Sequence, residues 1–250
     1  MEEKLSCVMD IGEQMLLSGA EVHRVEESIT RMCTALGAVR TDIFIITSSM
    51  IATVYTCDGN TFTQTRRIAS IGTDFEKIHR LNALSRRICG EDMSPSQIRL
   101  ALEQAVACKS YPFWLETGCY GLIAGVFTLF FGGGLQEAFI SLLTGLLTRL
   151  GTIVIEKGLS NKIFSMFFST ALATALAFFA LRLKLIPTVD MIIIGNIMSL
   201  IPGIGLTNAL RDLFTGDSIA GLLRSIEAVL VALAIAAGYF LVTILGGFMV

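Results

Sequence analysis

Five apolar stretches in the second half of the sequence limit what this chain can fold into. A helix needs roughly 20 apolar residues to cross the hydrocarbon core of a bilayer, and each stretch is close to that length or longer. The stretches cover residues 113–131, 137–155, 163–181, 188–214 and 220–248. We therefore expect an all-α membrane domain with about five transmembrane helices over residues 113–250.

The charged residues are concentrated in the other part of the chain. Residues 1–112 hold 12 of the 19 Lys and Arg and 14 of the 21 Asp and Glu. The whole chain is only 16% charged, whereas soluble domains average about a quarter. This division predicts a soluble domain over residues 1–112, followed by the membrane domain. The sequence has no clustered basic face of the kind that nucleic-acid binding needs, which argues against a nucleic-acid partner.

The first 112 residues have the pattern of a compact α+β domain in the order α-α-β-β-β-α-α. Apolar residues recur at helical spacing in two segments, and a β-branched and aromatic run follows them. The expected elements are helices over 5–17 and 22–36, strands within 41–67 with a hairpin turn at Asp58-Gly59, and helices that open at Asp74 and at Ser94-Pro95.

This domain carries no recognisable catalytic motif. It has neither a nucleophile elbow nor a phosphate-binding loop, and its two histidines, His23 and His79, lie on different expected helices. We therefore expect no enzyme activity, metal site or cofactor, and we expect its cysteines to be reduced and mostly buried. The helix that begins at "GAEVHRVEESI" is a candidate contact surface instead.

The distribution of Lys and Arg predicts the orientation in the membrane. The start of the sequence lacks the basic and apolar regions of a signal peptide, which favours a cytoplasmic N-terminus. The short loops on the inner side then receive five basic residues and those on the outer side two. They are Lys109, Lys157, Lys162, Arg211 and Arg224 inside, and Arg182 and Lys184 outside. The expected location is the bacterial cytoplasmic membrane, with the C-terminus outside.

The fourth apolar stretch is interrupted at Pro202-Gly203, which places a helix break near the expected middle of the membrane. Broken helices form substrate sites in many transporters, and Asn208 and Asp212 lie on one face after the break. A kink that only packs, or Asp212 serving as a structural partner of Arg211 or Arg224, is the alternative. Candidate substrate contacts are Pro202, Gly203, Gly205, Asn208, Asp212, Arg149 and Asn196, and candidate coupling or ion-pair residues are Asp212, Arg224, Glu227 and Asp190.

At these residues the sequence resembles a known family. The segment "LIPGIGLTNALRDLFTGDSIAGLLRSIEA" is similar to the membrane signature of the threonine/serine exporter family, and residues 1–112 are similar to the soluble domain of that family. The resemblance implies secondary export of small amino acids, or of dicarboxylates such as succinate in some members. Full-length members have about ten spans, twice the number expected here. The odd count of five is what an inverted repeat requires, because a second five-span unit then starts from the opposite side of the membrane. The chain therefore resembles the large subunit of the split type.

The resemblance implies a separate small membrane subunit as partner, with a homo-oligomer as the alternative. Other functions remain open from the residues alone. A membrane-anchored sensor or enzyme would act through residues 1–112 and would not need the break at Pro202-Gly203. A passive channel would transport without regard to an ion gradient. The available groups fit either an amino acid or a dicarboxylate, because both Arg149 and Asp212 are present.

Overall fold

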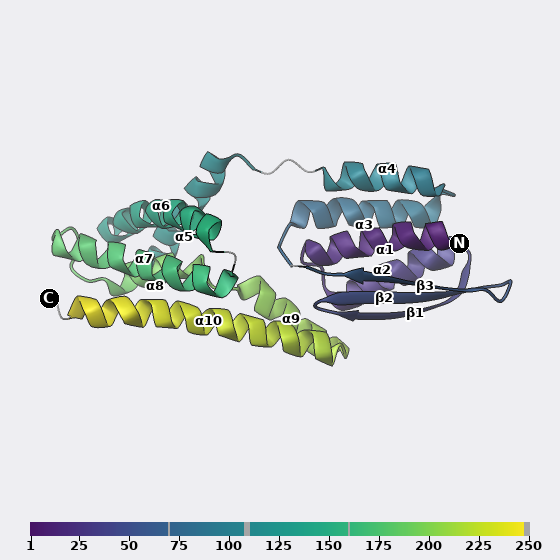
Figure 1. The fold of residues 1–250 in the computed structure, drawn as a ribbon. Helices are drawn as coiled ribbons and strands as arrows, with labels where there is room; N and C mark the ends of the chain where they lie inside the picture. The colour runs from purple at the N-terminus through teal and green to yellow at the C-terminus, as the bar shows by residue number, and fades with distance from the viewer. Residues whose placement is uncertain (70, 108–110, 160, 248–250) are drawn as a thin grey trace. The chain divides into compact units, whose positions relative to one another are not determined.

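The computed structural model describes residues 1–69, 71–107, 111–159 and 161–247. Its backbone forms two compact units (Figure 1). The first unit comprises Met1–Lys109 and Ile204–Ser225, and the second comprises Ser110–Gly203 and Ile226–Val250. Because the last helix contributes to both units, each unit is built from segments that are far apart in the sequence.

The first unit has the predicted order of helices and strands in its N-terminal part. Its elements are α1 (Glu2–Leu17), α2 (Val22–Ala35), β1 (Ala38–Ile46), β2 (Ser49–Thr56), β3 (Thr61–Arg67), α3 (Phe75–Gly90) and α4 (Pro95–Val106). The local signals act as expected: Asp74 accepts a hydrogen bond from the Lys77 amide at the start of α3, and Ser94 forms a capping box with Gln97. Both bonds satisfy amide groups that a helix start leaves unpaired.

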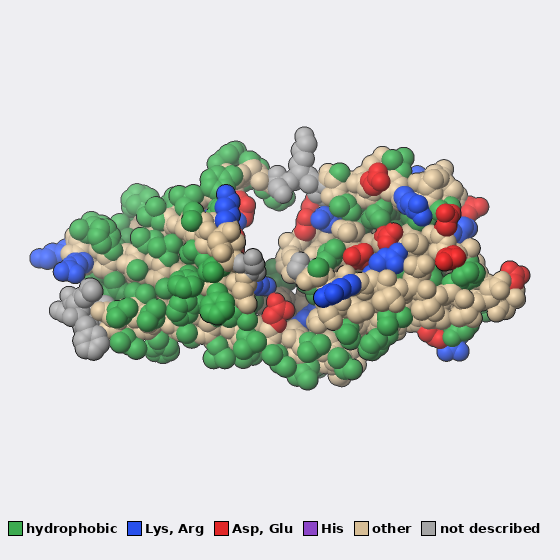
Figure 2. All heavy atoms as spheres, in the orientation of Figure 1, with side chains coloured by type: hydrophobic (Ala, Val, Ile, Leu, Met, Phe, Trp, Pro, Cys, Tyr) green, Lys and Arg blue, Asp and Glu red, His purple; other side chains and the backbone are tan. Residues whose placement is uncertain are grey.

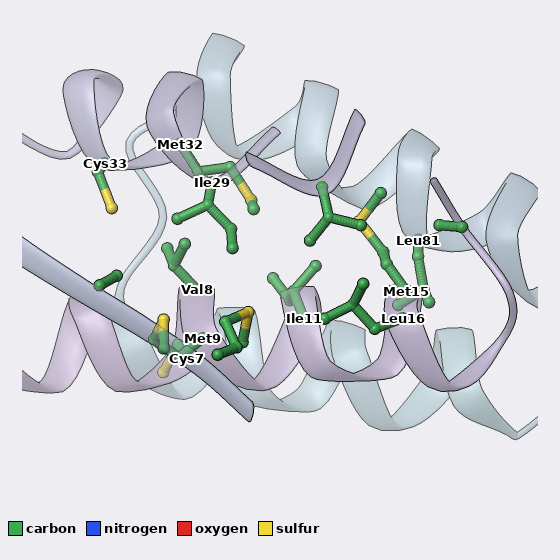
Figure 3. Packing of buried hydrophobic residues seen from close by; sticks show 14 of the residues in the cluster. Cys7, Val8, Met9, Ile11, Met15, Leu16, Ile29, Met32, Cys33 and Leu81 are labelled. Carbon is green, nitrogen blue, oxygen red and sulfur yellow. The ribbon is translucent and has the colours of Figure 1, made fainter. Parts of the chain in front are cut away.

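The three strands form an antiparallel sheet in the order β1-β2-β3. Side chains on β2 alternate, so that Met50, Ala52 and Val54 are buried while Ile51 between them is exposed. This alternation follows from the two-residue period of a strand. The buried face joins α1, α2 and α3 in one apolar core (Figure 3), which includes Val8, Met15, Ile29, Met32 and Leu81.

The cysteines in the described part of this domain divide evenly between core and surface. Cys7 and Cys33 are buried, whereas Cys57 and Cys89 are exposed. The expectation of mostly buried thiols was therefore wrong for Cys57 and Cys89, which lie in a hairpin turn and near the end of α3. Cys108 lies outside the described residues.

The second unit consists of helices. They are α5 (Phe113–Phe130), α6 (Leu135–Gly158), α7 (Lys162–Arg182), α8 (Asp190–Met198) and the greater part of α10 (Ser218–Gly247). Within the described residues, α5, α6, α7 and α10 are each long and apolar enough to cross a membrane, and α8 together with α9 (Gly203–Thr215) forms a broken fifth candidate. Large apolar side chains are exposed on these helices (Figure 2), as in proteins whose surface faces lipid. The chain is thus a membrane protein.

Glycines allow the helices of the second unit to approach closely. A Cβ atom added at Gly145 would lie 2.8 Å from the Ala124 Cβ, and one added at Gly125 would lie 3.0 Å from the Ala138 carbonyl oxygen. Such small-residue contacts are the usual basis of helix association in lipid, where the hydrophobic effect does not drive it. They bring α5 and α6 into direct backbone contact.

The first compact unit also includes a segment from the second half of the sequence. Residues 204–225, which hold α9 and the first turns of α10, belong with the N-terminal unit and not with the apolar helices. Their charged and amide side chains bond to residues of α2 and of the turn before it. Those bonds lie within the first unit.

Candidate functional site

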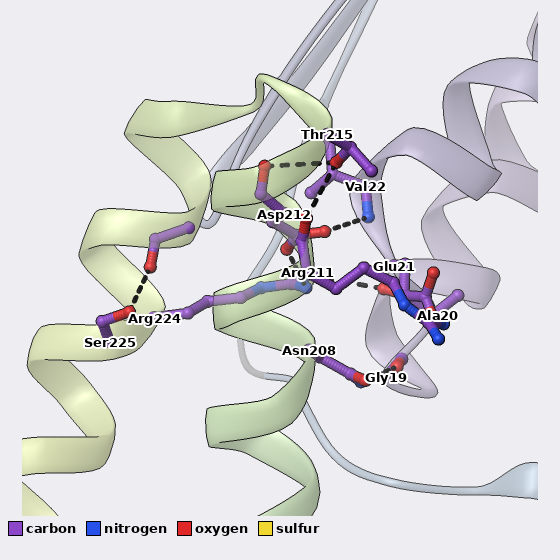
Figure 4. Close-up of polar contacts among 11 residues, drawn as sticks. Gly19, Ala20, Glu21, Val22, Asn208, Arg211, Asp212, Thr215, Arg224 and Ser225 are labelled. Carbon is purple, nitrogen blue, oxygen red and sulfur yellow. Dashed lines mark hydrogen bonds and ion pairs between the residues drawn. The ribbon is translucent and has the colours of Figure 1, made fainter.

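Asp212 is the most deeply buried charged residue among those that the structure describes. Its side chain on α9 is 1% exposed, and both carboxylate oxygens are occupied (Figure 4). One oxygen accepts a hydrogen bond from Arg224 Nη1 at 2.7 Å, and the other accepts one from the Val22 amide at 3.3 Å. Arg224 itself is only 9% exposed. The result is a buried, hydrogen-bonded ion pair between α9 and α10 that also contacts α2.

The partner of this ion pair is the short turn that joins α1 to α2. Its N-cap residue, Glu21, makes no side-chain capping bond, and the first amide of α2, that of Val22, donates to Asp212. A carboxylate in this position is favoured by the positive end of the helix dipole. Asp212 therefore caps a helix that lies 190 residues away in the sequence.

Three more bonds hold the same turn. Asn208 Nδ2 donates to the Gly19 carbonyl oxygen at 3.3 Å, and Arg224 Nη2 donates to the Ala20 carbonyl oxygen at 3.5 Å. Arg211 forms an ion pair with Glu21. Thus Asn208, Asp212 and Arg224, which the sequence offered as substrate or coupling residues, all bond to the turn in this structure.

The break in the fourth apolar stretch lies where the sequence placed it. The described chain leaves helical geometry after Met198 and resumes it at Gly203. Pro202 is half-buried within the break, and Gly203 and Gly205 are exposed at the start of α9. No Cβ atom added at Gly203 would meet a neighbour within 4 Å. Close packing therefore does not require a glycine at position 203.

A second polar site lies inside the second unit, around Asn196 on α8. Asn196 is 1% exposed, and its Nδ2 donates to Ser141 Oγ at 3.2 Å, Thr144 Oγ1 at 3.0 Å and the Ile192 carbonyl oxygen. Its Oδ1 is buried and has no hydrogen-bond partner among the described residues. An unpaired buried acceptor costs about 1–3 kcal/mol. This site therefore has an unused acceptor in an otherwise satisfied network.

The hydroxyl groups of this site belong to a polar stripe that the sequence interpretation missed. Along α6 the stripe recurs at helical spacing and is buried, and Thr152 at its end donates to Ser169 Oγ on α7 at 3.0 Å. The signal was present, because hydroxyl residues at intervals of three and four positions define one helix face. The stripe comprises Glu137, Ser141, Thr144, Thr148 and Thr152.

Glu137, at the start of this stripe, has both carboxylate oxygens engaged. Oε2 accepts from the Gly134 amide at 2.7 Å, and Oε1 accepts from Thr188 Oγ1 at 3.1 Å. The first bond satisfies the amide of Gly134, the N-cap residue of α6. The second ties α6 to the residues that precede α8.

The remaining predicted residues are not brought together. Arg149 on α6 pairs with Glu116 and Glu156 and stacks over the Tyr120 ring at 4.7 Å. Glu227 pairs with Lys162 at 3.7 Å, and both side chains are more than half exposed. Asp190 is exposed at the start of α8. Of the four candidate ion-pair residues, only Asp212 and Arg224 bond to each other within the described chain.

A cluster of titratable groups lies beside the turn at Glu21. Ligand-type atoms of His23, Glu26 and Asp217 lie within 4.8 Å of one another. Burial, followed by the negative charge of Asp217, raises the pKa of Glu26 from 4.5 to about 7, although His23 partly opposes this. Because His23 is exposed and such clusters commonly form without an ion, we assign no metal to these three residues.

The raised pKa of Glu26 predicts a pH-dependent stability. The folded state binds this proton more tightly than the unfolded state, so stability should fall as the pH rises from about 4.5 to 7. Replacing Glu26 with Gln should remove this part of the pH dependence of the thermal unfolding midpoint. Glu27→Gln, at an exposed neighbour that pairs with Arg31, should leave it in place. Equal pH profiles for wild type and Glu26→Gln would contradict the assignment.

Comparison with known proteins identifies the family. Residues 6–246 match the family described as "Putative threonine/serine exporter". The chain is 24% identical to the "Probable threonine/serine exporter" of Mycobacterium tuberculosis over 94% of its own length and 44% of that protein, so it spans less than half of this relative. It is 25% identical to the "Probable succinate transporter subunit YjjP" of Klebsiella aerogenes, over 90% of this chain and 86% of that protein. No solved structure matches. The chain belongs to the threonine/serine exporter family.

Proposed function

We propose that the chain is one subunit of a secondary transporter that exports small hydroxylated amino acids, threonine or serine, across the bacterial cytoplasmic membrane. The observation that carries the proposal is the Asn196 site, a buried amide with an unused acceptor among serine and threonine hydroxyls. Membership of the exporter family supports the same function. No enzymatic step forms part of this proposal.

The substrate would supply the donor that Asn196 Oδ1 lacks. Either the ammonium or the side-chain hydroxyl of threonine or serine can donate to a carbonyl-type oxygen. Ser141 and Thr144 hold the amide nitrogen of Asn196, and this orients Oδ1 away from them. A fixed acceptor of this kind distinguishes substrates that donate a hydrogen bond from apolar ones of the same size.

Export of a dicarboxylate is the second candidate, because the succinate transporter subunit is matched over 86% of its length. A dicarboxylate carries two negative charges, which need cationic or amide partners. Arg149, the arginine that the sequence offered for this role, already pairs with two carboxylates. Because the Arg149 guanidinium is already paired with Glu116 and Glu156, a zwitterionic amino acid is favoured over a dianion as the substrate.

The transporter would need a second subunit. The chain covers 44% of the mycobacterial relative, and a partner with about five further spans would complete an inverted repeat. In this arrangement residues 1–112 face the cytoplasm and the C-terminus lies outside. A homo-oligomer is the alternative source of the missing spans.

The proposed function is tested by efflux of labelled serine, threonine and succinate from preloaded cells. The cells express this chain alone or together with a small membrane protein, taken from the neighbouring gene if the genome has one there. Efflux of serine and threonine that requires both chains and an ion gradient is expected. Preference for succinate would support the second candidate, and gradient-independent efflux would indicate a channel. Absence of efflux for all three solutes would contradict both exporter proposals.

Substitution of Asn196 should strongly reduce this efflux. Asn196→Leu removes the acceptor and the three donated hydrogen bonds at nearly constant size, and we expect amino-acid efflux to fall at least tenfold, which corresponds to about 1.4 kcal/mol. Asn161→Asp is the control, because Asp caps the start of α7 as well as Asn161 does. Equal efflux from both variants and wild type, at equal amounts in the membrane, would exclude Asn196 from the site.

Substitution at the break at Pro202-Gly203 distinguishes two hypotheses for the function. One is the exporter, and the other is a sensor or enzyme that would act through residues 1–112. Export through a membrane domain with a broken helix requires the break, whereas a membrane anchor does not. Replacing both residues with Ala should therefore impair efflux under our proposal. A harmless replacement, together with an activity in residues 1–112, would favour the sensor or enzyme.

A further inference from the structure

The turn between α1 and α2 is held from two sides. Its own amides bond back to α1: the Gly19 amide donates to the Leu16 carbonyl oxygen and the Ala20 amide to that of Met15, both at 3.0 Å. Four of its other polar groups bond to α9 and α10 (Figure 4): the Gly19 and Ala20 carbonyl oxygens, the Glu21 carboxylate and the Val22 amide. Their partners there are Asn208, Arg224, Arg211 and Asp212. We call this set of contacts between Gly19–Val22 and the four side chains the joint.

The α9–α10 side of the joint is a closely packed hairpin. A Cβ atom added at Gly221 would lie 2.8 Å from the Leu213 amide nitrogen and 2.9 Å from the Ala209 carbonyl oxygen. The Asp212–Arg224 ion pair crosses the same interface. Because the two helices touch at the backbone, a displacement of the joint must move them together.

Both ends of this hairpin continue into the second unit. α9 follows the break after α8, and α10 is one uninterrupted helix that passes from Ser225 to Ile226 between the units. Breaks in helices absorb changes in backbone angles, whereas an intact helix transmits displacement. A movement at the joint can therefore pass along α10 into the second unit, and the break after α8 allows α9 to move with it.

The chemistry of the joint suits a contact that opens and closes. Its outer members, Asn208 and the partly exposed pair Arg211–Glu21, are hydrogen-bonding groups that water can satisfy when they separate. The inner pair, Asp212–Arg224, is buried and would keep the hairpin intact. Buried ion pairs are seldom the most stable choice for a fixed contact.

We propose that the joint couples the N-terminal unit to transport, so that residues 1–109 control the movement of the broken helix through Gly19–Val22. This inference rests on the proposed transport function, but the coupling itself has a readout that does not need transport. It assigns the signature residues Asn208, Arg211, Asp212 and Arg224 to transmission between the two units.

The test uses a double variant, Asn208→Ala with Arg211→Ala, in the full chain in lipid nanodiscs. It removes two outer contacts and keeps the buried ion pair, so the first unit should stay folded and Cys7 and Cys33 should stay inaccessible to maleimide. Glu91→Gln, which breaks the exposed Arg87–Glu91 pair on α3, is the control. Hydrogen–deuterium exchange is measured in peptides from 19–25, 204–225, 190–202 and 226–245.

We expect faster exchange at 19–25 and 204–225, which reports an opened joint, and also at 190–202 and 226–245, which reports coupling to the second unit. The control should change none of them. Faster exchange confined to 19–25 and 204–225 would overturn the coupling, and unchanged exchange in all four segments would overturn the joint itself.

Efflux adds a second readout that separates this inference from the proposed function. Coupling free energies of typical size change an equilibrium constant by about 5- to 150-fold. If the joint shifts the population of the transporting state by this much, efflux from the double variant should fall by a factor in the same range relative to wild type. If exchange is faster in all four segments of the variant but wild type shows no efflux of any solute, the proposed function is contradicted and the coupling is supported. Coupled exchange with undiminished efflux from the variant would overturn the control of transport.

Discussion

Arg224→Met is expected to lower the free energy of unfolding of the first unit by about 3–5 kcal/mol, because it leaves a buried carboxylate without its cation. Among the residues that the structure describes, Asp212 has no other charged partner within hydrogen-bonding distance, and its second bond is to the Val22 amide. The variant should thus expose the core around α1 and α2. The measurement is the temperature at which Cys7 and Cys33, both buried in wild type, react with maleimide in the full chain.

The matched variant is the double change Asp212→Asn with Arg224→Met. It removes both charges and keeps an oxygen that can accept from the Val22 amide, so most of the lost stability should return. Replacing both members of a buried pair costs less than removing one. A double variant that is no more stable than Arg224→Met alone would contradict the ion pair as the cause.

Gly195→Ala should disrupt the packing of α8 against α5. A Cβ atom at this position would overlap Thr128 Oγ1 and lie 2.6 Å from the Ala124 carbonyl oxygen. Since backbone atoms cannot rotate away, the helices must separate, at a cost of about 1–3 kcal/mol. The thermal unfolding midpoint should fall by about 2–4 °C per kcal/mol, and the neighbouring Asn196 should lose its bond to Ser141.

Gly118→Ala is the control for this prediction. Gly118 lies within α5, and a Cβ atom added there would meet nothing within 4 Å. Alanine is favoured over glycine in a helix interior by about 1 kcal/mol, so this variant should be as stable as wild type or more so. Equal effects of the two substitutions would mean that the close approach of α5 and α8 is not required.

The sequence predicted the elements of this chain better than their contacts. Asp74, Ser94 and the Asp58-Gly59 turn carry local signals, and each gives the expected helix start or hairpin. The lengths of the apolar stretches likewise predicted the candidate spans and the broken one among them. These features depend on neighbouring residues, which the sequence displays directly.

The contacts at Asp212 could not be predicted in the same way. A carboxylate in an apolar stretch has the same sequence signal whether it binds substrate, carries a proton or caps a helix. Its partner, the Val22 amide, is a backbone group 190 positions away and has no side-chain signature. Asn196 was identified as a candidate by its polarity, but its unused acceptor depends on how Ser141 and Thr144 orient the amide.

The length of α10 has a consequence for the depth of Arg224 in the membrane. Its 30 residues extend about 45 Å at 1.5 Å per residue, whereas the hydrocarbon core is about 30 Å thick. Both of its charged residues, Arg224 and Glu227, fall within residues 218–227, and the stretch 228–247 is uncharged. The uncharged stretch alone spans the hydrocarbon, so the first turns of α10 extend into the headgroup layer. We therefore expect the buried Arg224–Asp212 pair to lie at the depth of the headgroups and not within the hydrocarbon.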